Sequence, residues 1–403
     1  MSRFAQFVAL ATGHLAHRHS LRDVVANLQA QGARLCHLGV QPVARSSFAR
    51  VNETQPYTLY EALFGKLYDR CRHLAPRHGF RFKNKLYAMD ASLIDLSLRI
   101  FPWAHLALGK AAMKLHLGLD HDGFLPAFAV ITDGRVHDMA GAKSFAFSKG
   151  SIVVFDKGYS DYAWRQKLTD AGIYFVTRAR GNMVAKVIEE GPPAKGRIDF
   201  DRRVQLTGKQ KNSPKLTPLR LVGYTCPDTG RSYEFMTNIE HLCAQTIADI
   251  YKSRWQVELF FKWIKQNLKL KGFLGTSRNA VLTQIWVALC VCLLIAFLKF
   301  SSRVQLTMQQ IARLLQLNLF MRRDLLQPQD VMSRHRGAKL CRRYGLLGKI
   351  SLLSLEYLLF VERWPFHAGP PDHYGRLSSL LDLSVSQSGG LMPLHSTTDF
   401  RPV

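Results

Sequence analysis

The chain has 403 residues, of which 47 % are hydrophobic, so it can bury a sizeable core and global disorder is excluded. It carries 55 Lys and Arg residues against 29 Asp and Glu residues, which gives a net charge of +26. An excess of this size favours a polyanionic partner, either a nucleic acid or an anionic membrane surface.

The seven cysteines form no Cys-x-x-Cys pair and no regular ladder. This pattern argues against structural zinc and favours a reducing cytoplasm. The first 20 residues contain a short apolar run that Gln6 interrupts and no clear cleavage site, so a signal peptide is not expected.

Residues 1–80 predict a helical N-terminal DNA-binding domain. Ser20 and Ser46 are candidate N-caps of short helices, and a longer helix is expected from about Thr58. Two short helices followed by a third resemble a helix-turn-helix arrangement, although an ordinary helical cap fits the same pattern. The histidines nearby, which we expect to be solvated, are His14, His17 and His19.

The hydrophobic period changes at about residue 84. Residues 84–180 predict three strands, a helix, a strand, a helix and a strand, with a turn at Asp122 and Gly123. An antiparallel meander followed by crossovers is typical of an α/β sheet. Residues 181–242, rich in Gly, Pro and Lys, predict a β-rich insertion with an exposed basic loop at 208–216.

Helices are expected to resume in 243–300 and to continue through a C-terminal helical region, 301–363, before a loose tail, 364–403. One stretch, "AVLTQIWVALCVCLLIAFL" at 280–298, has the length of a membrane span and no formal charge. Because Thr283 and Gln284 are polar and no second such segment exists, we interpret it as a buried core helix.

The stretch "YKSRWQVELFFKWIKQNL", residues 251–268, predicts a helix with one polar stripe. At about 100° per residue the stripe is roughly 80° wide, and its members are Tyr251, Arg254, Glu258, Lys262 and Lys265. A solvated face with i,i+4 ion pairs is one interpretation. A single acid among bases, on a helix with an apolar opposite side, favours a bound polyanion instead.

Carboxylates at the ends of strands are candidates for a metal site. Asp90 follows the apolar run "LYAM" and Asp156 follows "SIVVF", and Glu258 would complete the set. Acids held close together resist ionisation unless cations lie between them, and Mg²⁺ prefers oxygen ligands. Strand-end capping and turn formation are the structural alternatives for the two aspartates. Asp133 is a rival, although its position before Gly134 is more typical of a turn.

Four motifs follow one another along the chain. The first two are "MDAS" at 89–92 and "FDKGY" at 155–159. The third has the spacing Tyr-x2-Arg-x3-Glu-x6-Lys and consists of Tyr251, Arg254, Glu258 and Lys265, and the fourth is "TQIWVAL" at 283–289. In these motifs the chain resembles the DDE transposases of insertion sequences, in the branch named for the fourth insertion sequence. The resemblance covers about residues 84–300 and extends more weakly to the N-terminal helices.

The resemblance implies a ribonuclease-H-like mixed sheet, with the insertion between the second Asp and the Glu. It implies Asp90, Asp156 and Glu258 as catalytic ligands of two Mg²⁺ (or Mn²⁺) ions. The implied reaction is cleavage at terminal inverted repeats and strand transfer into target DNA. The implied enzyme is bacterial and cytoplasmic, is associated with the nucleoid, and acts as a homodimer on double-stranded DNA. Tyr251, Arg254 and Lys265 would contact phosphates.

Two further expectations concern the stripe helix and the class of protein. Lys262 is expected to join the phosphate contacts. Trp255 is either a platform for an unstacked base or a core or interface tryptophan. A catalytically inactive DNA-binding repressor and a basic membrane protein anchored by 280–298 are the alternative functions. The intact Asp90, Asp156 and Glu258 argue against the repressor.

Overall fold

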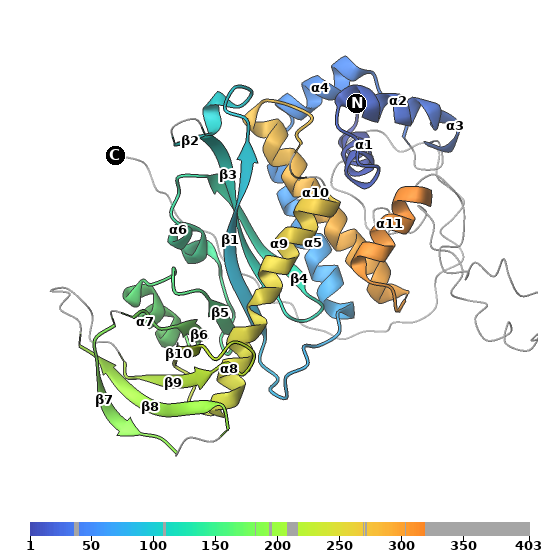
Figure 1. Ribbon diagram of the computed structural model, residues 1–403. Coiled ribbons are helices and arrows are strands. Elements are labelled where there is room, and N and C mark those ends of the chain that lie inside the picture. Colours follow the sequence, from blue (N-terminus) through green and yellow to red (C-terminus); the bar gives the residue numbers. More distant parts are fainter. Residues whose placement is uncertain are drawn as a thin grey trace, which may run out of the picture. The chain divides into compact units, whose positions relative to one another are not determined.

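The computed structural model describes residues 1–35, 40–107, 110–181, 183–192, 196–207, 217–268, 270, 272–302 and 304–318 (Figure 1). The expected basic loop at 208–216, the tail at 364–403 and most of the C-terminal helical region therefore lie outside the described residues.

Five helices begin the chain: α1 (Arg3–Leu15), α2 (Leu21–Ala30), α3 (Gly32–Leu35), α4 (Arg45–Thr54) and α5 (Thr58–Leu74). The predicted cap at Ser20 is confirmed, because its side chain accepts a hydrogen bond from the Asp23 amide. The predicted cap at Ser46 is wrong, since α4 begins at Arg45 without any side-chain cap.

A buried polar network joins α1, α4 and α5. The Tyr60 hydroxyl donates to Gln6 Oε1 (2.9 Å), and Gln6 Nε2 donates to Asn52 Oδ1 (2.8 Å). Buried polar groups need such partners. The network therefore fixes how the first helices pack.

The expectation that the three histidines are solvated is wrong for His14. Its ring is buried and lies 2.6 Å from the Leu268 carbonyl and 3.0 Å from the Gln284 carbonyl. Burial lowers the pKa of His14, against the effect of the two carbonyl oxygens. The histidine thus joins α1 to the helices near the end of the described chain.

The main sheet begins with an antiparallel meander. Its strands are β1 (Leu86–Leu96), β3 (Lys110–Asp120) and β4 (Leu125–Asp133), and a short β2 (His105–Ala107) follows a single 3-10 turn at Pro102–Ala104. The predicted turn between the second and third main strands is confirmed, with Gly123 at φ +69°. A left-handed backbone conformation of this kind favours glycine.

Two parallel strands extend the meander. β5 (Ile152–Phe155) pairs with β1, and β6 (Tyr174–Arg178) pairs with β5, while α6 (Asp138–Ser144) and α7 (Tyr162–Asp170) form the connections. The predicted order of elements across 84–180 is therefore confirmed.

The segment predicted as a β-rich insertion contains four strands: β7 (Ala185–Glu190), β8 (Ile198–Leu206), β9 (Leu219–Thr225) and β10 (Ser232–Thr237). β10 pairs with β6. The insertion strands thus continue the main sheet, in the order β2-β3-β1-β5-β6-β10-β9-β8-β7, with β4 also paired to β3.

The stripe helix is divided in two. α8 (Ala244–Ser253) and α9 (Trp255–Asn267) meet at Arg254, whose dihedral angles remain helical. There the backbone hydrogen bonds span three residues, because the Arg254 amide donates to the Tyr251 carbonyl and the Val257 amide donates to the Arg254 carbonyl. Helices α10 (Arg278–Ser301) and α11 (Met308–Asn318) follow. α10 has the length and composition of a membrane span, yet 94 % of its most hydrophobic stretch is buried within the molecule, as predicted for a core helix.

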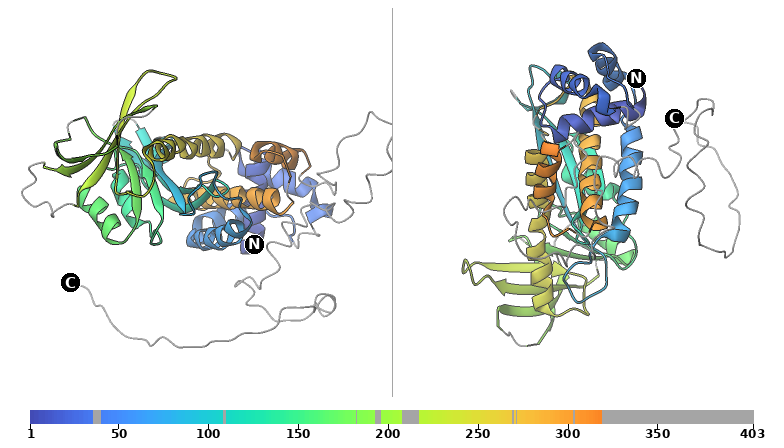
Figure 2. Two further views of the ribbon diagram at one scale, coloured as in Figure 1. Left: turned by 90° about the horizontal axis from the view of Figure 1, so that it is seen from below. Right: turned by 90° about the vertical axis from the view of Figure 1, so that its right-hand side faces the viewer.

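The helices cover both faces of the sheet (Figure 2). α6 and α7 pack on one face, whereas α8 and α9 lie along the other, with α9 against β1 and β3. α10 packs against α5 beside β4. This arrangement brings the stripe helix over the strands that carry the candidate aspartates.

Candidate active site

Asp90 and Asp156 lie at equivalent heights on neighbouring parallel strands. The last pair of β1 and β5 is Met89 with Phe155, so the two aspartates come next, where the strands stop pairing. The expectation that Asp90 ends its strand is wrong, because β1 continues to Leu96 alongside β3. Asp156 does follow the end of β5, as expected.

Two residues of the stripe reach these aspartates, and a third, Glu258, is joined to them through Arg254. The Tyr251 hydroxyl donates to Asp156 Oδ1 at 3.1 Å. Arg254 donates to Asp90 Oδ2 through Nη1 at 3.3 Å and to Glu258 Oε1 through Nη2 at 2.6 Å. The expected i,i+4 ion pair therefore exists, but Arg254 also links the helix to β1, and only 14 % of its side chain is exposed.

Burial dominates the electrostatics of the site. Burial raises the pKa of Asp90 to about 6, with the charges of Glu258 and Asp156 adding to the rise and Arg254 opposing it. Burial, followed by the charge of Asp156, raises the pKa of Tyr251 to about 12. Burial works against the charge on Arg254, but its bond to Glu258 leaves the pKa of the guanidinium raised.

The two lysines of the stripe differ in position. Lys265 Nζ donates to Ser92 Oγ at 2.8 Å and to the Leu93 carbonyl at 2.6 Å, so it is attached to β1 two residues beyond Asp90. Lys262 is exposed. Trp255 is also exposed, with 56 % of its surface open to solvent, which contradicts the core interpretation of this tryptophan within the monomer.

The rival acid Asp133 lies elsewhere. It is the last residue of β4 and pairs with Arg278 Nη2 at 3.1 Å, at the start of α10. Another acid of the sheet, Asp95, lies exposed within β1.

Sequence reasoning missed several residues beside the aspartates. Ser92 accepts the bond from Lys265, and Asp138 at the start of α6 is held by Lys114 (2.9 Å). Tyr159 was visible only as the last letter of "FDKGY". The spacing of the strands and of the helical stripe carries no signal for these contacts, since they depend on how α9 and α6 pack on the sheet.

The donor set suits a hard divalent cation, because it consists of carboxylates whose mutual repulsion a cation would relieve. Among the described residues, however, no group of three or more His, Cys, Asp or Glu side chains is arranged ready to hold an ion. Arg254 lies between Asp90 and Glu258 and supplies positive charge there. A bound cation would take over that role.

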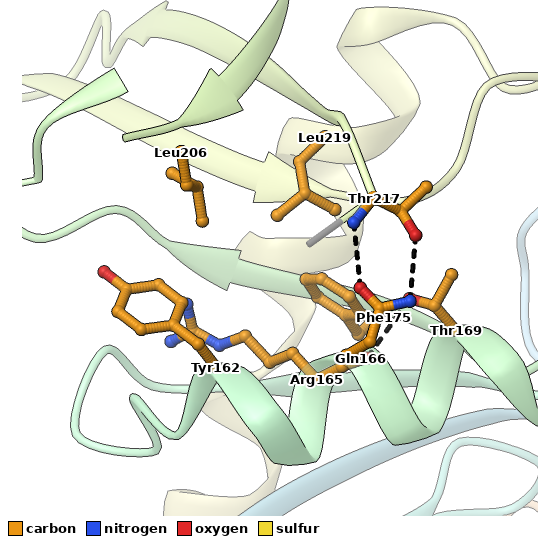
Figure 3. A pocket seen from close by; sticks show the side chains of 8 residues that line it. All are labelled: Tyr162, Arg165, Gln166, Thr169, Phe175, Leu206, Thr217 and Leu219. Atoms are coloured by element: carbon orange, nitrogen blue, oxygen red, sulfur yellow. Dashed lines mark hydrogen bonds between the residues drawn. The ribbon is translucent and has the colours of Figure 1, made fainter. Parts of the chain in front are cut away.

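A separate pocket lies between α7 and the insertion strands β8 and β9, with an open volume of about 220 Å³ (Figure 3). Gln166 and Thr217 face each other across it through two hydrogen bonds, and Arg165 lies beneath the Tyr162 ring. None of the described residues that line this pocket is a carboxylate. It is therefore not a rival metal centre.

Comparison with known proteins identifies the family. Residues 85–294 match the family described as "Transposase DDE domain", and residues 1–41 match a domain of unknown function. The chain is 31 % identical to a putative transposase of Sinorhizobium fredii over 72 % of this chain and 82 % of that protein. It is 28 % identical to a probable transposase for insertion sequence element IS5377 of Geobacillus stearothermophilus, over 64 % and 68 % of the two chains.

Among solved structures, the chain is similar to one in a piggyBac transposase synaptic complex with hairpin DNA. The similarity covers 79 % of this chain and 71 % of that chain, with 12 % sequence identity and a TM-score of 0.42, and no conclusion rests on it. The family match spans β1 to α10 and includes both aspartates, Arg254 and Glu258. The chain belongs to the DDE transposase family, and its enzymatic class is that of the transposases.

Proposed function

We propose that this transposase cleaves DNA at the terminal inverted repeats of its own insertion sequence and joins the freed ends to target DNA. Asp90, Asp156 and Glu258 are the proposed catalytic carboxylates. The observation that supports this most is a pair of contacts between the stripe and the strands. Tyr251 donates to Asp156, and Arg254 donates to Asp90. A solvated helix face would make neither contact.

The proposed fold of the catalytic core is ribonuclease-H-like. The order β4-β3-β1-β5-β6, with an antiparallel meander and two parallel strands, is the arrangement that the resemblance implies. The match of Tyr251, Arg254, Glu258 and Lys265 to the signature supports membership of the branch named for the fourth insertion sequence. The domain limits proposed are those set out above, with 1–80 binding DNA.

The proposed cofactors are two Mg²⁺ (or Mn²⁺) ions held by Asp90, Asp156 and Glu258. When bound, such ions supply Lewis acidity toward a phosphodiester and a water molecule or 3′ hydroxyl. The protein's own part is to orient the carboxylates. Tyr251 donates its hydroxyl to Asp156 Oδ1 and so orients that carboxylate, and Arg254 bridges Asp90 and Glu258. Asp90, Asp156 and Glu258 would hold the ions.

The proposed DNA surface consists of the stripe helix and its exposed flank. Arg254, Lys262 and Lys265 would contact phosphates, and Trp255 would stack on a base displaced at the cleaved end. The net charge of +26 supports binding of a polyanion. A homodimer on paired element ends, in the bacterial cytoplasm beside the nucleoid, is the proposed working state.

A cleavage assay tests the proposal. The substrate is a duplex that carries the inverted repeat found beside the gene, incubated with Mg²⁺ or with a chelator. Asp156→Asn should reduce cleavage by about three orders of magnitude or more, while Asp95→Asn, on an exposed side chain of β1, should leave it unchanged. Metal-independent binding without cleavage by the wild type would contradict the proposal and favour the inactive repressor instead.

A further inference from the structure

The loop between α5 and β1, residues 75–85, is strongly basic. Its sequence, "APRHGFRFKNK", contains four Lys or Arg residues and no acid. Arg77, Arg81 and Lys83 are exposed, and none of the three makes a hydrogen bond or an ion pair with the residues that the structure describes. In Figure 1 the loop is the blue segment that leads from α5 into β1. Like charges held this close repel one another, and a polyanion would relieve that repulsion.

Hydrogen bonds attach this loop to the sheet. The His78 amide donates to Asp122 Oδ1 at 2.8 Å, and a ring nitrogen of His78 lies 2.9 Å from the Asn84 carbonyl. Asn84 Nδ2 donates to the Gly150 carbonyl at 2.6 Å. Lys85 Nζ donates to Asp122 Oδ2 at 2.7 Å. The loop is therefore held against the turn that follows β3 and the segment that precedes β5.

Aromatic rings stiffen the middle of the loop. The rings of Phe80 and Phe82 stack with 5.1 Å between their centroids and 19° between their planes, and the His78 ring lies 4.9 Å from that of Phe82. The two phenylalanines are partly buried, whereas Arg81 between them and Lys83 after them are exposed. A segment braced in this way has little conformational entropy to lose on binding, so its bases are preorganised for a ligand.

We propose that the α5–β1 loop is a second DNA surface, on which Arg77, Arg81 and Lys83 contact backbone phosphates of the duplex held at Asp90. This inference rests on the proposed function. Lys83 precedes Asp90 by seven residues, so the chain limits the distance between their Cα atoms to about 25 Å. One turn of B-DNA is longer, about 34 Å, so a single duplex can span both places. Phosphate contacts carry no sequence information, so the loop contributes affinity and register rather than sequence preference.

The test is the salt dependence of binding to the inverted-repeat duplex, measured by fluorescence anisotropy in the presence of a chelator. The variant combines Arg77→Gln, Arg81→Gln and Lys83→Gln, and it should melt like the wild type because all three side chains are exposed. Each phosphate contact adds about 0.9 to the slope of log affinity against log salt, so the slope should fall by about 2.7. Between about 50 and 200 mM salt the wild type should therefore lose about 40-fold more affinity than the variant.

Two controls separate the loop from bulk charge and from folding. A charge-preserving variant, Arg77→Lys, Arg81→Lys and Lys83→Arg, should keep the wild-type slope. A second triple variant, made to Gln at exposed bases of the insertion, should lower the slope by less than about one; its positions are Lys186, Arg197 and Arg231.

Three results would overturn the inference while the wild type still shows a steep salt response. They are an unchanged slope in the loop variant, an equal fall in the insertion variant, and a fall on the inverted repeat without a fall on an unrelated duplex of the same length. A flat response in the wild type itself would refute the proposed function and this inference with it. The two kinds of failure are therefore distinguishable.

Discussion

Replacing Asp90 by Asn should stabilise the metal-free protein, although it removes a proposed catalytic group. The pKa of Asp90 rises to about 6 from 3.8, chiefly because the carboxyl group is buried. Only 25 % of its side chain is exposed. Asparagine has the same shape, and its side-chain oxygen can still accept the bond from the Ala91 amide that Asp90 Oδ1 accepts at 2.8 Å.

The size of the effect follows from proton linkage. Because the folded-state pKa is raised, the penalty for the charge is absent below pH 3.8 and complete above pH 6. At about 1.4 kcal/mol per pH unit between these two values, the penalty is about 3 kcal/mol at pH 8 and about 1.6 kcal/mol at pH 5. For a chain of this size, about 3 kcal/mol corresponds to a rise of roughly 4 °C in melting temperature.

Thermal unfolding in the presence of a chelator, followed by circular dichroism from pH 4.5 to pH 8, measures the effect. Asp90→Asn should melt higher than the wild type at pH 8, and the difference should shrink as the pH falls. Asp95→Asn, an exposed change on the same strand, should show neither trend. Saturating Mg²⁺ should stabilise the wild type more than Asp90→Asn, because a cation that binds the folded state stabilises it. A lower melting temperature for Asp90→Asn at pH 8 would refute the reasoning.

Four further outcomes are expected. The affinity for the inverted-repeat duplex should fall linearly on logarithmic axes as salt rises, and a flat salt response would remove the polyanion interpretation. Lys265→Ala should slow cleavage about tenfold or more, because Lys265 is bonded to β1 beside the site, whereas Lys262→Ala should have a smaller effect; equal mild losses would favour a solvated face. Trp255→Ala should melt like the wild type, since Trp255 is exposed, and should cleave about 10- to 100-fold more slowly, with partial rescue by an abasic nucleotide; a loss of several degrees without rescue would contradict stacking. Gly141→Ala should melt several degrees lower in a thermal scan, because the new Cβ would lie 2.3 Å from the His116 ring, and an unchanged melting temperature would show that the ring moves freely.

The local part of the site could be predicted from the sequence. The stripe follows from helix geometry alone. Two of its members, Tyr251 and Arg254, donate hydrogen bonds to the aspartates, and a third, Glu258, accepts one from Arg254. The position of Asp156 after the end of β5 was predicted correctly, because a short apolar run by itself indicates a buried strand and where that strand ends. Asp90 was identified but misplaced, because the strand continues through the more polar segment that follows it.

The remaining contacts could not be predicted, since they join residues far apart in the chain. Arg254 reaches Asp90 across 164 positions, and His14 reaches the Leu268 carbonyl across 254 positions. Their existence depends on how helices pack on the sheet, which hydrophobic periodicity does not specify. Because histidine is polar, the sequence predicted that His14 is exposed to solvent. Its burial is explained by the carbonyl groups of Leu268 and Gln284, which bond to its ring nitrogens.

In the part of the chain that the structure describes, the sheet has ten strands; β1 and β5, which carry the proposed catalytic aspartates, lie in its interior, and β7 is an edge strand. Each strand pair keeps its own register through its own hydrogen bonds, and four strands, β6, β10, β9 and β8, separate β5 from the outer edge. Lengthening, shortening or replacing strands at that edge leaves the alignment of Met89 with Phe155 untouched. Related elements can therefore diversify the surface at one end of the sheet without disturbing the pair of strands that carries Asp90 and Asp156.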